Sequence, residues 1–227
     1  MSAGGFRDGP FGVFAVIWRP VRTLRDVAGG RGARQGFVVV ALYAALSFVL
    51  SVFFVLAGAP RRQFERPGLL PGFGEGLAGA AEVGAPILSL LYPFAIWLSV
   101  SLSMHLATRP FGGTGPFSSM LGVVGVAQAP LLAGGALVAG LAGLQRLAGA
   151  ETAVGAALGF SVSLLSFALA LWYVVLVVVG ASLARNVGYG ESAGACALSC
   201  VGLGILIIVL VLIAGVGVFT VAGATQG

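Results

Sequence analysis

The chain has 227 residues, of which 59% are apolar and only 8% are charged, and its mean hydropathy is +1.07. Soluble domains carry about a quarter charged residues, so this composition excludes an ordinary cytosolic enzyme, a disordered chain and a disulfide scaffold. The 37 glycines follow no three-residue period, which excludes collagen. The sequence therefore predicts an all-α polytopic membrane helical bundle, whose lipid-facing side chains must be apolar.

The first 35 residues differ in character from the rest, and we expect residues 1–35 to form a cytoplasmic or interfacial segment. Apolar residues recur at helical spacing from Phe11 to Trp18, and Pro20 begins a second short helical stretch. The arginines that border this apolar face are Arg19, Arg22 and Arg25. The pattern predicts an amphipathic helix lying on the cytoplasmic leaflet.

Five later segments are apolar over the roughly 20 residues that a helix needs to cross a bilayer core. The predicted spans, which make up a membrane domain over residues 36–222, are residues 36–57, 84–107, 117–144, 152–184 and 193–222. The fourth span exceeds the required length, so we expect it to tilt or to extend beyond the membrane. The loop 58–83, rich in Gly and Pro, is expected to be irregular, and residues 223–227 form a short external tail.

The distribution of arginine predicts the orientation, because cytoplasmic loops are enriched in positive charge. With a cytoplasmic N-terminus, the inside segments hold Arg7, Arg19, Arg22, Arg25, Arg31, Arg34, Arg109 and Arg185, and the outside loops hold Arg61, Arg62, Arg66 and Arg146. This asymmetry favours a cytoplasmic N-terminus and an external C-terminus. The absence of lysine suggests a GC-rich coding bias, and we expect a multi-pass protein of a prokaryotic cytoplasmic membrane.

Three polar residues lie on one face at the cytoplasmic end of the second span. Ser101, His105 and Arg109 follow one another at intervals of four, which stacks them along a helix. Catalysis by a serine and a histidine requires the two side chains to converge on a substrate, and stacking on one helix does not supply that geometry. We therefore interpret His105 as structural or interfacial.

The third span contains a second polar position. Gln128 lies two residues before Pro130, which removes a backbone hydrogen bond from the helix. Gln128 is placed to satisfy the freed carbonyls or to reach a neighbouring helix. The alternative interpretation is a polar site in a pore or pocket.

Other kinds of site find no support in the sequence. The spans carry no acid or arginine in their interiors, which argues against proton-coupled transport. The turn at Gly112 and Gly113 lacks the Lys and Ser/Thr of a P-loop, and Cys196 and Cys200 have too few ligands nearby for a metal. We expect no cofactor, metal, nucleotide or nucleic acid.

Small residues recur every four positions in the later spans, a pattern that lets helix backbones approach closely. The rows are Gly125, Ala129 and Ala133; Gly135, Ala139 and Gly143; Gly155, Gly159 and Ser163; and Gly180, Ala184 and Gly188. They predict a compact bundle and leave a homo-oligomer seam open.

Three longer stretches of the sequence form a pattern that covers nearly the whole chain. They read "IWRPVRTLRDV" near the start, "HLATRPFGGTGPFSSMLGVVGVAQAPLL" around the second loop, and "LWYVVLVVVGASLARNVGYGESAGACAL" later. Their distinctive features are Pro20, the Gly112–Gly113 turn, Pro130, Trp172 and Ala193. In these features the chain resembles the prokaryotic branch of the Yip1 family.

The resemblance implies a five-span membrane protein with a cytosolic N-terminus and no enzymatic activity. Eukaryotic members act in vesicle traffic through small GTPases, a role that is not carried over to a prokaryote. Our hypothesis is a membrane protein that contacts the lipid bilayer and binds other membrane proteins, or itself, or shapes the bilayer. The alternative is a small channel or transporter for ions or lipids, supported by the proline kinks, Gln128 and serines 99, 101 and 103.

Overall fold

The computed structural model describes residues 10–29, 32–57, 73–149, 151–202 and 204, with side chains for all of these except residues 10–13 and 73–82. Within this part of the chain every regular element is a helix, which confirms the all-α prediction. The elements are η1 (Pro10–Ile17), α1 (Pro20–Ala28), α2 (Gly32–Leu56), α4 (Phe73–Ala107), η2 (Arg109–Phe111), α5 (Phe117–Ala127), α6 (Ala129–Ala148) and α7 (Ala153–Arg185). Residues 189–202 are also helical.

Four stretches within the described residues are long and apolar enough to cross a membrane. They are Gly32–Leu56, Val83–Phe111, Phe117–Ala148 and Ala153–Arg185. Each contains or closely overlaps one of the first four predicted spans. The predicted fifth span is helical over residues 193–202, but most of its remainder lies outside the described residues, so the number of five spans stays a prediction.

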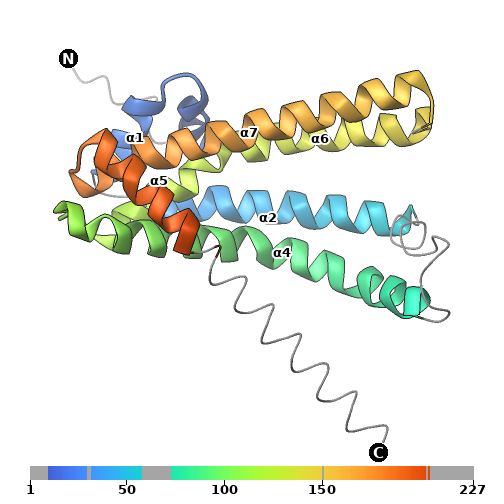
Figure 1. Ribbon diagram of the computed structural model, residues 1–227, viewed down its shortest axis with the longest axis horizontal. Helices are drawn as coiled ribbons and strands as arrows, with labels where there is room; N and C mark the ends of the chain where they lie inside the picture. The colour runs from blue at the N-terminus through green and yellow to red at the C-terminus, as the bar shows by residue number, and fades with distance from the viewer. Residues whose placement is uncertain (1–9, 30–31, 58–72, 150, 203, 205–227) are drawn as a thin grey trace, which may run out of the picture.

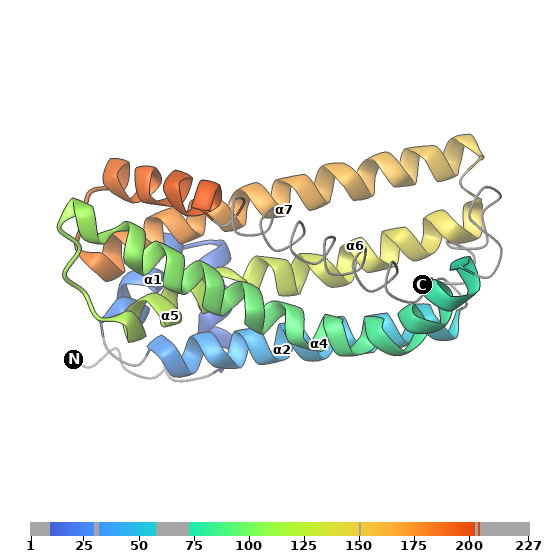
Figure 2. The same ribbon diagram turned by 60° about the horizontal axis from the view of Figure 1, so that its bottom comes forward.

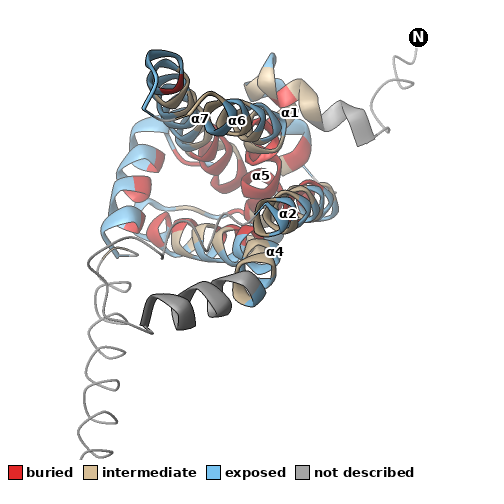
Figure 3. Cartoon of the chain, turned by 90° about the vertical axis from the view of Figure 1, so that its right-hand side faces the viewer, coloured by how far each residue is buried: buried red, intermediate tan, exposed pale blue. Residues whose placement is uncertain are grey.

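The long helices are arranged as two antiparallel pairs. Figures 1 and 2 show α2 beside α4 and α6 beside α7, with the short helix α5 lying where the two pairs meet. From there α5 contacts α2, α4 and α7. Figure 3 shows α5 in the middle of the bundle, surrounded by helices whose outer surfaces are exposed.

The core of the bundle is built around α5. In the third candidate span, 50% of the residues in the most apolar 18-residue stretch are buried, whereas in the other three spans the buried share is 11 to 22%. The third span is therefore central, and the others face outward. Met120 and Val123 of α5 are fully buried, together with Leu176 of α7. The outer helices instead expose large apolar side chains such as Phe53 and Phe167, as expected where the solvent is lipid.

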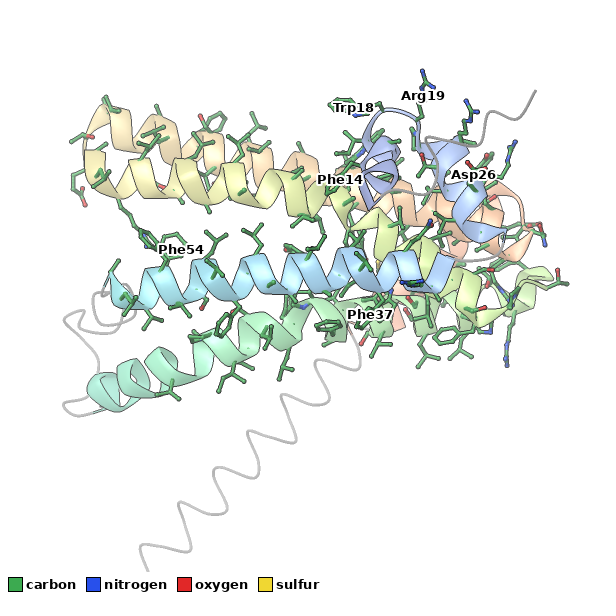
Figure 4. All side chains as sticks on the ribbon, turned by 180° about the vertical axis from the view of Figure 1, so that it is seen from behind. Phe14, Trp18, Arg19, Asp26, Phe37 and Phe54 are labelled. Carbon is green, nitrogen blue, oxygen red and sulfur yellow. The ribbon has the colours of Figure 1, made fainter. Side chains whose placement is uncertain are left out.

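The helices η1 and α1 lie in the N-terminal segment for which the sequence predicts an amphipathic helix. Leu24 and Val27, on the apolar face of α1, are buried, and α1 contacts α5 and α7. This face therefore packs on the protein and not on lipid. Figure 4 shows Trp18 and Arg19 pointing away from the bundle, and Trp18 is 80% exposed. Whether the segment lies at the membrane surface stays a prediction.

The structure differs from the sequence-based prediction at the beginning of the second span and in the middle of the third. Residues 58–72 lie outside the described residues, but residues 73–83 of the expected irregular loop form the beginning of α4. Alanine, leucine and glutamate between the glycines are strong helix formers, and they extend the helix that the second span begins. The third span, expected as one kinked helix, divides at Gln128 into α5 and α6.

Candidate functional site

The predicted face of Ser101, His105 and Arg109 does not form one site. Ser101 is fully buried and its hydroxyl has no hydrogen-bond partner. The His105 ring packs edge-on against Phe117 at the start of α5, with 5.3 Å between ring centroids, and its Nδ1 is also without a partner. Arg109 lies beyond the end of α4, in η2, and is exposed. The neighbour of His105 is thus an aromatic ring, and its structural role stays an interpretation.

Gln128 and Pro130 mark the break between α5 and α6. Gln128 follows the last residue of α5 and precedes the first residue of α6. Pro130 lies in the first turn of α6, where backbone N–H groups have no acceptor within the helix, so a proline there costs no helical hydrogen bond. The Gln128 side chain is 1% exposed and lies beside Tyr173 of α7. Neither the Gln128 Oε1 nor the Tyr173 hydroxyl has a hydrogen-bond partner. These two side chains form a polar spot inside an apolar bundle.

Trp172 and the serines of the second span differ in their exposure. Trp172 is 37% exposed on α7, among outward-facing apolar neighbours such as Val174. Ser99 is exposed, and the Ser103 hydroxyl donates to the Val100 carbonyl at 3.2 Å. Of the three serines only Ser101 points inward, because residues two apart on a helix cannot share a face.

A buried arginine is the principal polar feature that the sequence analysis did not identify. Arg185, expected in a cytoplasmic loop, is the last residue of α7 and only 3% exposed. Its Nε donates to the Thr108 hydroxyl at 3.1 Å, and its Nη2 donates to the Gly113 carbonyl at 2.5 Å. The Thr114 N–H donates in return to the Arg185 carbonyl at 3.0 Å. This set of contacts, the Arg185 clamp, joins α7 to the connection between α4 and α5.

Glycines allow the connecting loop to reach the clamp. Gly112 adopts a left-handed conformation with φ of 79°, which side chains with a Cβ rarely accept. At Gly115, a Cβ would lie 1.7 Å from the Ala184 carbonyl oxygen. The turn that the sequence suggested at Gly112 and Gly113 is present, and its Gly113 carbonyl accepts a hydrogen bond from the Arg185 guanidinium. The glycines indicate that another backbone or side chain comes close to this loop, but nothing in the sequence indicates that Arg185, 72 residues after Gly113, is the residue that does so.

Glycines also bring α2 and α5 into backbone contact. A Cβ on Gly36 would lie 2.7 Å from the Leu121 carbonyl oxygen, and a Cβ on Gly122 would lie 2.5 Å from the carbonyl carbon of Gly32. A Cβ on Gly125 would likewise lie 2.5 Å from the Gly36 Cα. Gly125, a member of a predicted row of small residues, therefore does lie at a close helix contact. Gly32 and Gly36 on α2 have the same spacing of four residues, but the sequence analysis did not include them among the rows of small residues.

Trp97 of α4 packs against the contact between α2 and α5. Its indole N–H donates to the Leu121 carbonyl at 2.8 Å, and its ring lies 6.3 Å from that of Phe37 on α2. This buried tryptophan was not singled out by the sequence analysis. Together with the glycines it joins α2, α4 and α5 at one place in the bundle.

Metal-ligating groups do not gather within the described residues, where no cluster of three His, Cys, Asp or Glu side chains occurs. Cys196 is buried and Cys200 is exposed, and both are free thiols. The arrangement is that of an apolar bundle fastened by glycine contacts, the Trp97 hydrogen bond and the Arg185 clamp.

Comparison with known proteins agrees with this architecture. No curated protein and no solved structure gives a significant match to the chain. The family model described as the Yip1 domain matches residues 14–213, a range that includes the clamp, the α2–α5 contact and all four candidate membrane spans. The chain is a membrane protein that belongs to the Yip1 family.

Proposed function

We propose that this protein is a non-enzymatic component of a prokaryotic cytoplasmic membrane that binds other membrane proteins, or further copies of itself, and organises them in the bilayer. The observation that carries the proposal is the division of the bundle into a packed centre and an apolar exterior. The central helix α5 is buried at Met120 and from Gly122 to Ala127, whereas α2, α4 and α7 present large apolar side chains outward. Such surfaces suit contact with lipid and with other transmembrane helices.

The arrangement of polar groups supports the same role. His105 packs on Phe117, and the partners of Arg185 are a hydroxyl and a carbonyl. General acid–base and nucleophilic chemistry need groups within hydrogen-bond reach of one another and of a substrate. The polar contacts of this bundle are instead used to hold helices together.

Site-specific photocrosslinking in native membranes tests partner binding. A crosslinking amino acid is placed in turn at Phe53 on α2, Leu91 on α4 and Phe167 on α7, all exposed. We expect adducts with one or a few proteins, or with a second copy, from one of these faces, identified by mass spectrometry. The other two faces serve as matched controls. Equal labelling from all three faces, with lipid as the only product, would contradict the proposal.

A second candidate function, a small channel or transporter for ions or lipids, is favoured by one observation. Ser101, Gln128 and Tyr173 carry buried polar atoms without partners inside the bundle, and a buried polar group needs a hydrogen-bonding partner or water. Flux of ions or fluorescent lipids in liposomes that contain the protein, compared with a Gln128→Leu variant, decides this alternative. Flux that the variant abolishes would favour transport over the organising role.

A further inference from the structure

Two arginines adjoin Thr108 at the end of the second span, one through a hydrogen bond and one in the chain. Arg185 is bonded to the Thr108 hydroxyl, and Arg109 follows Thr108 in the chain and is exposed. The C-terminal ends of α4 and α7 thus assemble a cationic cluster, defined here as Arg109 and Arg185.

The charge of this cluster is not balanced by the contacts that hold it. Both hydrogen bonds of the Arg185 guanidinium within the described residues end on neutral oxygens. The carboxylate of Glu191, which follows Arg185 in the chain by six residues, is exposed and accepts the Gly188 N–H at 2.8 Å, so it caps its own turn. Burial of a cation without a counter-charge is unfavourable, and an anion beside the cluster would relieve this.

The depth of the cluster in a membrane follows from helix length. The 33 residues of α7 span about 50 Å at 1.5 Å per residue, whereas the hydrocarbon core is about 30 Å thick. An upright, centred α7 would place Arg185 about 25 Å from the bilayer midplane, just beyond the headgroup layer, which ends at about 20–22 Å. The tilt expected for this overlong span brings Arg185 to the depth of the headgroups, where the phosphates of lipids are found.

The surface below the cluster suits an acyl chain. Leu98, Leu102 and Leu106 are exposed on α4 at intervals of four, so they form one outward stripe that ends three residues before Arg109. Phe111 is also exposed at this end. An apolar stripe that leads to a pair of arginines fits a lipid better than a soluble anion, which would make no use of the leucines.

We propose that the cluster of Arg109 and Arg185 binds the phosphate of an anionic lipid headgroup, with the acyl chains along Leu98, Leu102 and Leu106 of α4. Arg109 contacts the phosphate, and Arg185 adds its charge from the protein side. This site depends on the protein residing in a membrane and not on its binding of other proteins. Failure of the partner experiment above therefore leaves it unaffected, and the reverse also holds.

Thermal unfolding of the full chain in a neutral detergent tests the site. The Tm is measured with increasing dioleoylphosphatidylglycerol, and separately with dioleoylphosphatidylcholine and with inorganic phosphate, since a ligand bound by the folded state raises the Tm. We expect a saturable rise with phosphatidylglycerol alone. Arg109→Gln should raise the lipid concentration needed for half of this rise about fivefold, the effect of one arginine at a membrane surface, while Arg109→Lys keeps most of the affinity.

The matched control is Arg146→Gln, an exposed arginine at the opposite end of the bundle, which should leave the lipid response unchanged. Arg185→Lys keeps the buried charge and should preserve the affinity within about twofold. The proposal is overturned if Arg109→Gln binds phosphatidylglycerol as the unaltered protein does, or if Arg146→Gln weakens binding equally. An equal rise with phosphatidylcholine or with inorganic phosphate would also overturn it.

Discussion

Arg185 decides, at the scale of single residues, how α7 meets the rest of the bundle. Its side chain reaches Thr108 and Gly113, and its carbonyl receives the Thr114 N–H, so backbone and side chain both bind the α4–α5 connection. Hydrogen bonds to a charged donor are stronger than neutral ones, and their loss leaves buried acceptors unsatisfied. One residue thus links elements far apart in sequence.

Replacement of Arg185 should destabilise the fold. We expect Arg185→Gln to lower the free energy of unfolding by about 2–4 kcal/mol, because two charge-assisted hydrogen bonds are lost. Unfolding in mixed micelles with increasing denaturing detergent measures this change. Arg146→Gln is the control: Arg146 is exposed and stacks over Phe54 at 4.3 Å, a contact that contributes about 0.5–1 kcal/mol. Similar losses for both variants would show that the clamp adds nothing specific.

At the scale of elements, the crossing of α2 and α5 rests on glycine. Lipid offers no hydrophobic drive for helix association, so close packing of backbones must supply it. Gly36 and Gly122 permit an approach at which added Cβ atoms would lie within 3 Å of the opposite backbone. Because backbone atoms cannot move aside as a flexible side chain can, this contact has little tolerance for larger residues.

Glycine substitutions should therefore depend on position. Gly122→Ala places a methyl group 2.5 Å from the Gly32 carbonyl carbon, and we expect a loss of about 1–3 kcal/mol in stability from overpacking. Gly140→Ala on α6, where a Cβ meets nothing within 4 Å, should be neutral or stabilising by up to about 1 kcal/mol. The same unfolding assay compares the two, and equal effects would contradict the close crossing.

At the scale of the whole molecule, positive charge is concentrated at one end of the bundle. Most of the described arginines lie at the end formed by α1, the start of α2, η2 and the end of α7, whereas Arg146 lies at the opposite end. The members at the first end are Arg19, Arg22, Arg25, Arg34, Arg109 and Arg185. Membrane proteins place such an end in the cytoplasm.

Cysteine labelling checks this orientation. In a background with Cys196→Ala and Cys200→Ala, single cysteines are introduced at Ser118, beside the start of α5, and at Glu151, between α6 and α7; both positions are exposed. An impermeant maleimide added to intact cells should label Glu151→Cys and spare Ser118→Cys until the cells are opened. The reverse labelling pattern would place the arginine-rich end outside.

Much of the helical framework was predictable because long apolar runs determine where a membrane helix begins and ends. The fourth span, predicted to end at residue 184, ends at Arg185, and the first begins at Gly32, close to the predicted residue 36. The contacts of the candidate site were harder to predict from the sequence. Ser101 and His105 do share a helix, but His105 meets a phenylalanine, and the clamp joins Thr108 to a residue 77 positions later.

The sequence by itself determined that the protein is helical, that it resides in a membrane, and where four candidate membrane-spanning helices lie, because composition and local periodicity carry that information. Only the tertiary structure decided that the apolar face of α1 packs on α5 and α7, and that α5 is the centre of the bundle. It also decided that Arg185 is buried rather than solvated. These features depend on which helices become neighbours, and apolar side chains in lipid do not specify their neighbours until close backbone packing and a few hydrogen bonds select them.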